Sequence, residues 1–389
     1  MNWRKLLSIF LVLCMLFSFA ACGEEDYEEE EETEETEEKE ETKDTEETQS
    51  PEASDPEETT APEATTPEDT TAPEATVPEE KPTEPEELPT EPTVPEDPIP
   101  SIEPPDSSTP LLYKVTDDKG NVAWLFGSIH VGADYFYPLP EYVTSAYEGS
   151  DALAVEIDIT AFENDVDALT KYLQQMLYLD GTTVKDHIPK NLFNQARRIL
   201  AENDMLVPFI EYYHVTIWEQ FITEIVYDKI GANSDLGIDM HFLNRAYDEG
   251  KKVISIESFD QRVEMDWGYS EPLQALLLED AIASYNAPEA YKAGMEEMMA
   301  IWATGDEEMF SAYLNQEVTF ESPEEEALYI EYVTALETNR NIVMTAFVED
   351  SLASGEEVFV CVGAAHVVGN GAMVELLRDS GYTVTLVQE

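Results

Sequence analysis

The segment Trp124-Leu125-Phe126-Gly127-Ser128-Ile129-His130 decides the fold, because its pattern returns near the other end of the chain as Val360-Cys361-Val362-Gly363-Ala364-Ala365-His366. Each copy is an apolar run, a glycine, two small or apolar residues and a histidine. The run predicts a buried β-strand, and the glycine lets the backbone turn where the strand ends. Ligands of open sheets usually bind beyond the strand ends. The two G-x-x-H copies therefore predict histidines that share one cavity if their strands are neighbours.

Two further apolar segments each lead into a carboxylate. Leu153-Ala154-Val155 precedes Glu156, and Val253-Ile254-Ser255-Ile256 precedes Glu257. Both segments predict strands with a glutamate at the end. The order along the chain is His, Glu, Glu, His, which suits two pseudo-related halves that each contribute one G-x-x-H strand end.

The remaining elements follow from residue spacing and turn chemistry. Strands expected at 112–116 and 121–126 flank Asp117-Asp118-Lys119-Gly120, a hairpin signal. Apolar residues at helical spacing, with glycine or proline near the ends of the segments, predict helices at 140–149, 164–179, 190–202, 208–230 and 236–249. The chain closes with a βαβ pattern: a strand at 357–362, a helix at 373–380 and a strand at 382–387.

The first 22 residues predict a lipoprotein signal peptide. A short basic start is followed by an apolar run from Leu6 to Ala20 and by small residues, which is too short for a spanning helix. Phe19-Ala20-Ala21-Cys22 resembles the lipobox of bacterial lipoproteins, although Phe19 stands where leucine is usual. Cys22 is therefore expected to carry a lipid that anchors an extracytoplasmic protein to the cell membrane. The alternative is that Cys22 lies beside an ordinary cleavage site.

Residues 23–110 predict a disordered acidic stalk, and residues 111–389 predict one folded domain. The stalk repeats Glu, Thr and Pro and holds one aromatic residue, Tyr27, so it has almost nothing to bury. It carries 35 acidic and 3 basic residues, which leaves 50 acidic and 15 basic residues for the domain.

This acidity excludes several partners. The whole chain has a net charge of −65, and nucleic acids and anionic membrane surfaces both require lysine and arginine. Of three cysteines, Cys14 lies in the signal and Cys22 at the lipid site, so the domain has no disulfide framework. Cys361 lies in an apolar strand and is expected to be a buried thiol.

Two imidazoles and one or two carboxylates around an open cavity suit a divalent transition metal with free coordination positions. Such a metal acidifies bound water and polarises a carbonyl, which is the chemistry of peptide or ester hydrolysis. A glutamate that does not bind the metal can accept the proton of that water. Glu156 and Glu257 each suit either role. The alternative is that both histidines are hydrogen-bonded structural residues.

Several segments, in this order, resemble the TraB/PrgY/GumN family, which is related to the Tiki membrane proteases. They are residues 125–130, 155–158, 237–239, 250–257, 339–341 and 362–366, with Gly369 following. The resemblance spans residues 112–387 and excludes the signal and the stalk. It implies an α/β fold like that of the erythromycin esterase and ChaN-like group: a mixed central β-sheet surrounded by helices.

The resemblance also implies roles for single residues. In Tiki-like members the two G-x-x-H histidines and the glutamate that ends the first of the two glutamate-ending strands form a metal-dependent peptidase site, supported by manganese or cobalt. The matching positions here are His130, His366 and Glu156. Other motif positions, expected around the same cavity, are Glu257, Asp239 and Arg340. Arg340 is expected to hold a carboxylate or to bind an oxyanion, with an ordinary salt bridge as the alternative.

The sequence thus favours a lipid-anchored peptidase that acts on peptides or a surface protein and uses divalent Mn, Co or Zn. Two alternatives stay open. One is a tethered module that captures an extracellular peptide without turnover. The other is an esterase for a small molecule, which the erythromycin esterase relation implies.

Overall fold

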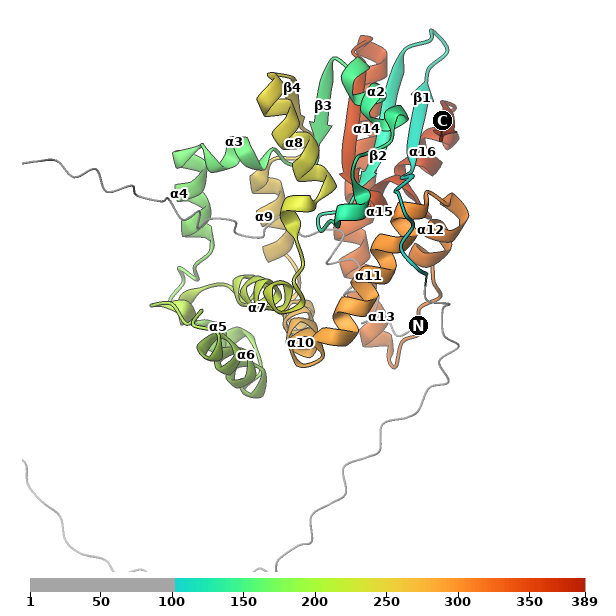
Figure 1. Ribbon diagram of the computed structural model, residues 1–389. Helices are drawn as coiled ribbons and strands as arrows, with labels where there is room; N and C mark the ends of the chain where they lie inside the picture. The colour runs from blue at the N-terminus through green and yellow to red at the C-terminus, as the bar shows by residue number, and fades with distance from the viewer. Residues whose placement is uncertain (1–101, 389) are drawn as a thin grey trace, which may run out of the picture. The chain divides into compact units, whose positions relative to one another are not determined.

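A mixed six-stranded sheet forms the centre of this computed structural model, which describes residues 102–388 (Figure 1). Its spatial order is β4-β3-β5-β2-β1-β6. The strands are β1 (Leu112–Thr116), β2 (Val122–Ser128), β3 (Ala152–Val155), β4 (Lys252–Ser255), β5 (Val358–Gly363) and β6 (Thr383–Val387). Neighbours from β4 to β2 are parallel, whereas β1 is antiparallel to both β2 and β6. The predicted α/β fold with a mixed sheet is confirmed. The predicted signal peptide, Cys22 and the predicted stalk up to residue 101 lie outside the described residues.

Local chemistry explains the hairpin between β1 and β2. The side chain of Asp117 accepts hydrogen bonds from the backbone N–H groups of Lys119 and Asn121, each 2.8 to 2.9 Å long. Gly120 supplies a left-handed backbone with φ of +88°. Asn121 also donates to the Leu352 carbonyl and so ties the turn to a helix. The hairpin predicted from these residues is confirmed.

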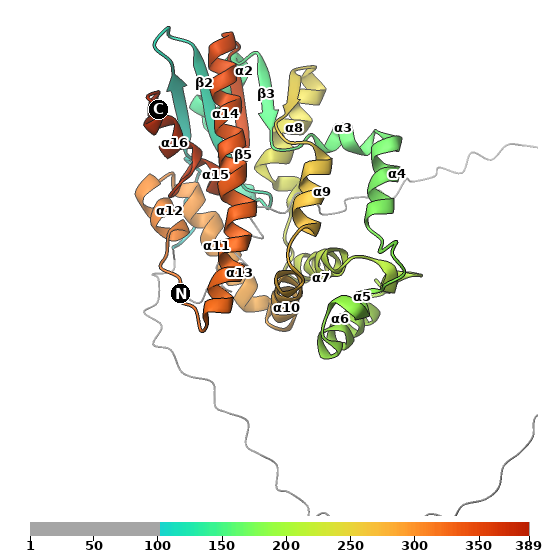
Figure 2. The same cartoon turned by 180° about the vertical axis from the view of Figure 1, so that it is seen from behind.

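Helices cover both faces of the sheet. Figures 1 and 2 show α2 (Glu141–Gly149) and α8 (Ile238–Glu249) on one face and α14 (Asn339–Ser354) and α16 (Met373–Asp379) on the other. On the α2 and α8 face, Phe126, Phe242 and Phe359 pack as an aromatic cluster with ring centroids 4.9 to 5.6 Å apart. Tyr147 of α2 extends this cluster. These contacts fix the helices on the strands that end at the site.

A helical lobe lies beyond the carboxyl ends of β2 and β3 (Figure 1). Its own core includes the fully buried Trp218, packed against Phe193. The lobe comprises α3 (Ile159–Glu163), α4 (Val166–Gln175), α5 (Val184–His187), α6 (Lys190–Glu202), α7 (Val215–Ile230), α9 (Phe259–Trp267) and α10 (Glu271–Asn286). Three more helices, α11 (Pro288–Thr304), α12 (Glu307–Leu314) and α13 (Pro323–Val333), lead back to the sheet. Within residues 102–388, no helix has the length and apolar character needed to span a membrane.

A π-helical turn precedes α14. The segment η4 (Thr334–Thr338) joins α13 to α14, and the N–H of Asn339 donates to the carbonyl of Thr334, five residues earlier. π-helical turns inside longer helices occur often at functional sites. Here the turn ends two residues before Arg340.

Three details differ from the sequence-based expectations. β6 pairs with β1 at the sheet edge, so the closing βαβ unit spans two intervening strands. The helix expected from 208 begins at Val215, because Phe209 is left-handed with φ of +65° and starts a separate 3-10 turn. Residues before β1 pack on the domain: Thr109 N–H donates to Ala303 O and Ser108 Oγ to Phe136 O. The expected two-halves symmetry stays a prediction.

Candidate functional site

The strand topology brings both G-x-x-H turns to one edge of the sheet. β2 and β5 are parallel neighbours, with Gly127 opposite Val362 and Ser128 opposite Gly363. His130 follows β2 closely, and His366 lies on α15 (Ala364–Val367), a short helix that follows β5. The two strands are neighbours, as the prediction of a shared cavity required, but His366 is fully buried and does not line the small cavity beside His130.

The two glutamates end the next two strands at the same edge. Glu156 follows β3, which pairs with both β5 and β4. Pairing continues past the strands, since the N–H of Glu257 donates to the carbonyl of Glu156 at 2.9 Å. Both glutamates are less than a tenth exposed. Four residues from distant parts of the chain therefore meet at the carboxyl edge.

Close backbone packing requires glycine at two points. A Cβ on Gly127 would lie 2.9 Å from Cα and Cβ of Ala364, so the two G-x-x-H turns touch there. A Cβ on Gly237 would lie 2.5 Å from the carbonyl oxygen of His130. The backbone of Ile238 donates to Ile129 O, which docks the start of α8 against the first turn. Asp239 on α8 is thereby held beside His130.

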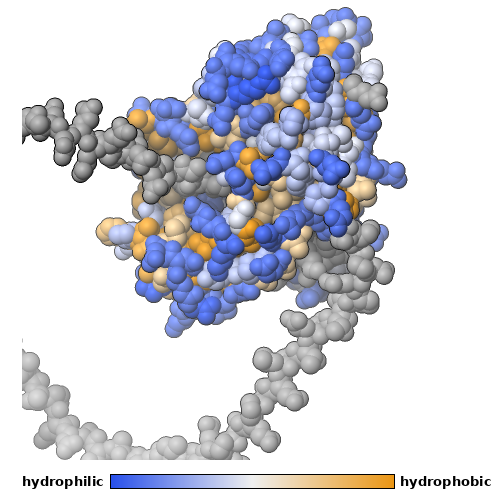
Figure 3. Space-filling view, in the orientation of Figure 1, coloured by the Kyte–Doolittle hydropathy of each residue, from blue (hydrophilic) through white to orange (hydrophobic). Residues whose placement is uncertain are grey.

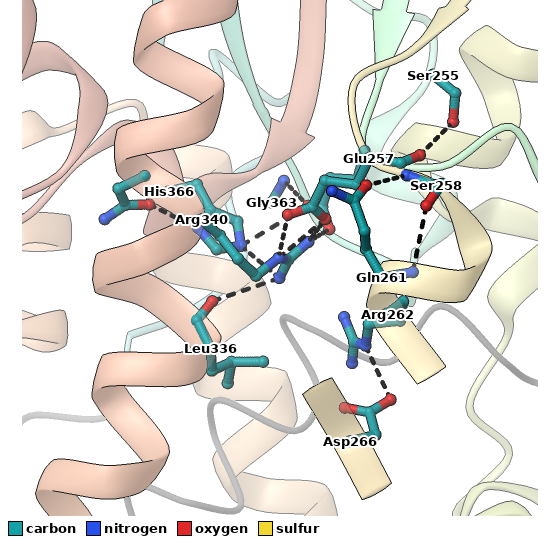
Figure 4. Close-up of polar contacts among 12 residues, drawn as sticks. Ser255, Glu257, Ser258, Gln261, Arg262, Asp266, Leu336, Arg340, Gly363 and His366 are labelled. Atoms are coloured by element: carbon teal, nitrogen blue, oxygen red, sulfur yellow. Dashed lines mark hydrogen bonds and ion pairs between the residues drawn. The ribbon is translucent and has the colours of Figure 1, made fainter. Parts of the chain in front are cut away.

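Arg340 is the centre of the polar contacts (Figure 4). Its Nε donates to both carboxylate oxygens of Glu257 at 2.9 and 3.0 Å, and Nη2 donates to Glu257 Oε2 at 2.7 Å. Nη2 also donates to Glu156 Oε2 at 2.5 Å. Nη1 lies 2.9 Å from His366 Nε2 and 3.4 Å from the carbonyl oxygen of Leu336. Of the expected roles, the geometry matches the one in which Arg340 holds carboxylates in place.

His366 is a neutral acceptor in this arrangement. Its Nδ1 lies 2.7 Å from Oδ1 of Asn341, which assigns the ring proton to Nδ1 and leaves Nε2 to accept from Arg340. Burial, and then the Arg340 charge, lower the pKa of His366 to about 3. Glu156 differs: burial alone would raise its pKa, but Arg340, followed by His366 and His130, holds the pKa well below its ordinary value. The backbone N–H of Gly363 also donates to Glu156, at 2.7 Å.

His130 has a different partner. Its Nδ1 lies 2.9 Å from Asp239 Oδ2, so the ring is paired with a carboxylate. Burial lowers the pKa of His130, but the charge of Asp239 and then of Glu156 outweighs burial and raises the pKa above 6.5. His130 Nε2 is buried and has no hydrogen-bond partner among residues 102–388. A histidine oriented by a carboxylate, with its second nitrogen unused, is suited to proton transfer or to ligand binding.

A small cavity adjoins His130. Its lining includes Ser128, His130, Glu156, Asp239 and Cys361, and its volume is about 10 Å³, enough for roughly one water molecule. Burial raises the pKa of the Cys361 thiol well above its ordinary value, which agrees with the expected inert buried cysteine. A wider hollow of about 660 Å³ lies elsewhere, beside Glu307 and Gln388, and none of the four strand-end residues lines it. The small cavity is therefore the one that bears on the chemistry.

The donors around this edge are suitable in kind for a metal, because His130, His366 and Glu156 offer two imidazole nitrogens and a carboxylate. Their arrangement does not fit: within residues 102–388, no group of three or more His, Cys, Asp or Glu side chains is placed to hold a metal ion. The physical reason is Arg340, which bonds to His366 Nε2 and Glu156 Oε2.

Three features of the site have no clear signal in the sequence. Asn341 orients His366, and only its position next to Arg340 hints at this. Arg262 on α9 pairs with Asp266 at 2.9 Å. Its charge helps to lower the pKa of His366 and opposes, without reversing, the raised pKa of His130. Figure 4 shows Arg262 beside the Arg340 contacts. The third feature is the π-helical turn before Arg340.

Fold and site together define an α/β protein whose mixed sheet carries a buried, charged, histidine-containing site at the carboxyl edge of its parallel strands. Comparison with known families makes the assignment more specific. The model of the TraB/PrgY/gumN family matches residues 111–386, so the chain belongs to that family.

Known relatives are distant. The chain is 22% identical over 254 residues to the uncharacterized protein YbaP of Escherichia coli strain K12, which covers 65% of this chain and 87% of YbaP. YbaP of Shigella flexneri matches equally well. The chain is also 21% identical over 311 residues to the metalloprotease TIKI2 of Danio rerio, which covers 67% of this chain and 58% of that protein. No solved structure shows a significant match.

Proposed function

We propose that this protein is a lipid-anchored, extracytoplasmic hydrolase that cleaves peptides or a surface protein. The observation that carries the proposal is the convergence of His130, Glu156 and His366 at one buried edge, with His130 Nε2 unused beside Glu156. Sequence similarity to a protein named as a metalloprotease supports hydrolysis of peptide bonds over hydrolysis of other bonds.

The cofactor in this proposal is one divalent Mn, Co or Zn ion, and His130, His366 and Glu156 would be its ligands only if Arg340 no longer bonded to His366 and Glu156. Such an ion would supply an acidified water and a polarised carbonyl. The protein's own residues have separate tasks. Asp239 orients the ring of His130, and Asn341 orients that of His366. Arg340 keeps the buried Glu156 ionised and holds Glu257 in place by hydrogen bonds.

Peptide turnover tests this function. The full chain is incubated with a mixed peptide library and Mn²⁺, Co²⁺ or Zn²⁺ in turn, and products are identified by mass spectrometry. Wild type should yield cleaved peptides, and His130→Ala and Glu156→Gln should reduce the rate at least about 100-fold. His187→Ala is the matched control, because His187 pairs with Glu271 in the helical lobe. Peptides that bind but stay intact would instead favour the alternative of a tethered module that captures an extracellular peptide without turnover.

Anchoring is tested separately. Cys22→Ser should move the chain from the membrane fraction to the soluble extracytoplasmic fraction, because the lipid would have no attachment point. The measurement is an immunoblot of fractionated cells. A Cys22→Ser chain that stays in the membrane fraction would contradict the lipid anchor and leave the hydrolase proposal untouched.

A further inference from the structure

The small cavity beside His130 has a wall that is largely apolar. Val155, Ile157 and Leu243 form its buried part, and each of them is at most 4% exposed. Ile159 and Met240 complete the apolar wall and are only half-buried. The same cavity is thus lined by His130 and by two side chains that solvent reaches.

Two segments that the fold fixes beside His130 supply most of this wall. Ile159 begins α3 shortly after the end of β3. Met240 and Leu243 are three residues apart on α8, so they lie on the same side of that helix. Asp239 of the same helix pairs with His130 at 2.9 Å. A group that contacts this wall is therefore held beside the imidazole.

The size of the cavity limits what it can accept. Its volume of about 10 Å³ is enough for roughly one water molecule, and a methyl group is of similar size. The side chains of leucine and phenylalanine are several times larger. A single extra methylene group in an apolar pocket changes discrimination about 10- to 200-fold. The cavity therefore fits a side chain of alanine size and excludes larger ones.

Charge narrows the choice further. Glu156 lines the cavity as a carboxylate that is paired with Arg340. An acidic side chain of a substrate would lie against this carboxylate and be repelled. Lysine and arginine side chains carry the opposite charge but are far too long for the space. A small uncharged side chain is the class that satisfies both limits.

We propose that this cavity is a specificity pocket, which accepts a small uncharged side chain of alanine size next to the bond that is cleaved. The inference rests on the proposed hydrolase function and does not depend on the identity of a cofactor. Leu243 and Ile159 set the size of the pocket. The bound residue presents its peptide bond beside His130.

Peptide cleavage measures this preference. The full-length chain is given a mixed peptide library, without metal and with Mn²⁺, Co²⁺ or Zn²⁺ in turn, and the residues beside each cleaved bond are identified by mass spectrometry. Two peptides of one cleaved sequence are then compared, with alanine or leucine at the position beside the cleaved bond. For wild type, kcat/KM should be at least about tenfold higher with alanine than with leucine.

Variants of the wall test the pocket itself. Leu243→Ala should lower the alanine-to-leucine ratio of kcat/KM at least about tenfold, because the wider pocket admits the leucine side chain. Leu276→Ala is the matched control. Leu276 is a buried leucine of α10 that does not line the cavity, so its removal should leave the ratio as in wild type.

A second variant keeps the test valid if Leu243→Ala does not fold. Ile159→Ala truncates a half-buried side chain of the same wall, so it costs less stability and should shift the ratio in the same direction. Equal cleavage of both peptides by wild type, or folded variants that keep the wild-type ratio, would overturn the specificity pocket while the hydrolase function stands. No cleavage of any peptide by wild type would overturn the proposed function and the pocket with it.

Discussion

Glu156 and Glu219 are both buried carboxyl groups, and their pKa values move in opposite directions. Burial raises the pKa of each. At Glu156 the adjacent Arg340 reverses the effect and holds the pKa well below its ordinary value. At Glu219 the hydrogen bond comes from Thr223, whose hydroxyl donates at 3.1 Å, and the pKa rises to about 8. The guanidinium bonded directly to Glu156 thus keeps that glutamate charged, whereas the charge of Arg262 does not overcome the effect of burial on Glu219.

This contrast predicts the pH dependence of Glu219→Gln. Below pH 4.5 both folded and unfolded chains carry the proton on Glu219. As pH rises to about 8 the unfolded chain loses that proton while the folded chain keeps it, so wild type loses stability in this interval. Glutamine has no proton to lose. The free energy of unfolding of Glu219→Gln should therefore rise relative to that of wild type between pH 4.5 and 8, by on the order of a few kcal/mol.

Urea unfolding at several pH values measures this difference. Glu308→Gln, which removes an exposed carboxylate from α12, is the control. A difference between Glu219→Gln and wild type that stays constant from pH 4.5 to 8 would contradict the raised pKa.

The two G-x-x-H turns act as one element, because each positions the other. Gly127 at the end of β2 lies against Ala364 at the start of α15, and Trp302 Nε1 donates to the Gly127 carbonyl at 2.8 Å. The spacing between His130 and His366 therefore depends on the absence of a side chain at position 127. A change in this contact would therefore alter the positions of both histidines.

Gly127→Ala should destabilise the protein by about 1–3 kcal/mol, because the new methyl group would overpack the contact with Ala364. Gly294→Ala is the matched control. Gly294 lies inside α11. In the part of the chain that the structure describes, no atom outside its own helical turn lies within 4 Å of the point that an alanine methyl group would occupy. Alanine there should stabilise the protein by about 0.5–1 kcal/mol. Urea unfolding of both variants tests the pair. Gly127→Ala with unchanged stability would contradict the tight packing of the turns.

Sequence patterns predicted local elements better than their pairing. The helix expected at 190–202 is observed as Lys190–Glu202, and the β1–β2 hairpin was evident from its turn residues. Pairing of β6 with β1 depends on contacts across almost the whole domain, which no local pattern encodes. The site divides in the same way. Its four strand-end residues stand out in the sequence because their patterns repeat. Arg340 is 83 residues from Glu257 and 184 residues from Glu156 along the chain, so only the fold shows that it bonds to both.

At the scale of the whole molecule, negative charge dominates. The domain from residue 111 holds 50 acidic and 15 basic residues, so its exposed surface repels itself. Figure 3 shows a largely hydrophilic face, with hydrophobic residues scattered among it and over the helical lobe. The exposed apolar side chains include Leu173, Leu179 and Phe209, which is 77% exposed. We therefore still expect weak attraction to anionic surfaces.

Salt should therefore stabilise the protein. Raising NaCl from about 10 mM to about 200 mM shortens the screening length severalfold and reduces the repulsion among exposed carboxylates. The melting temperature of the full chain, followed by circular dichroism, should rise by several degrees across this range. A melting temperature that falls with added salt would show that favourable ion pairs outweigh the repulsion.

Whether the strand-end residues bind one metal ion is the question on which the proposed chemistry depends. The direct measurement is bound metal per chain after equilibrium dialysis against Mn²⁺, Co²⁺ or Zn²⁺, for wild type, His130→Ala, His366→Ala and the control His187→Ala. We expect about one ion per chain in wild type and His187→Ala, and little in the other two. Equal metal content in all four proteins would contradict the metal site.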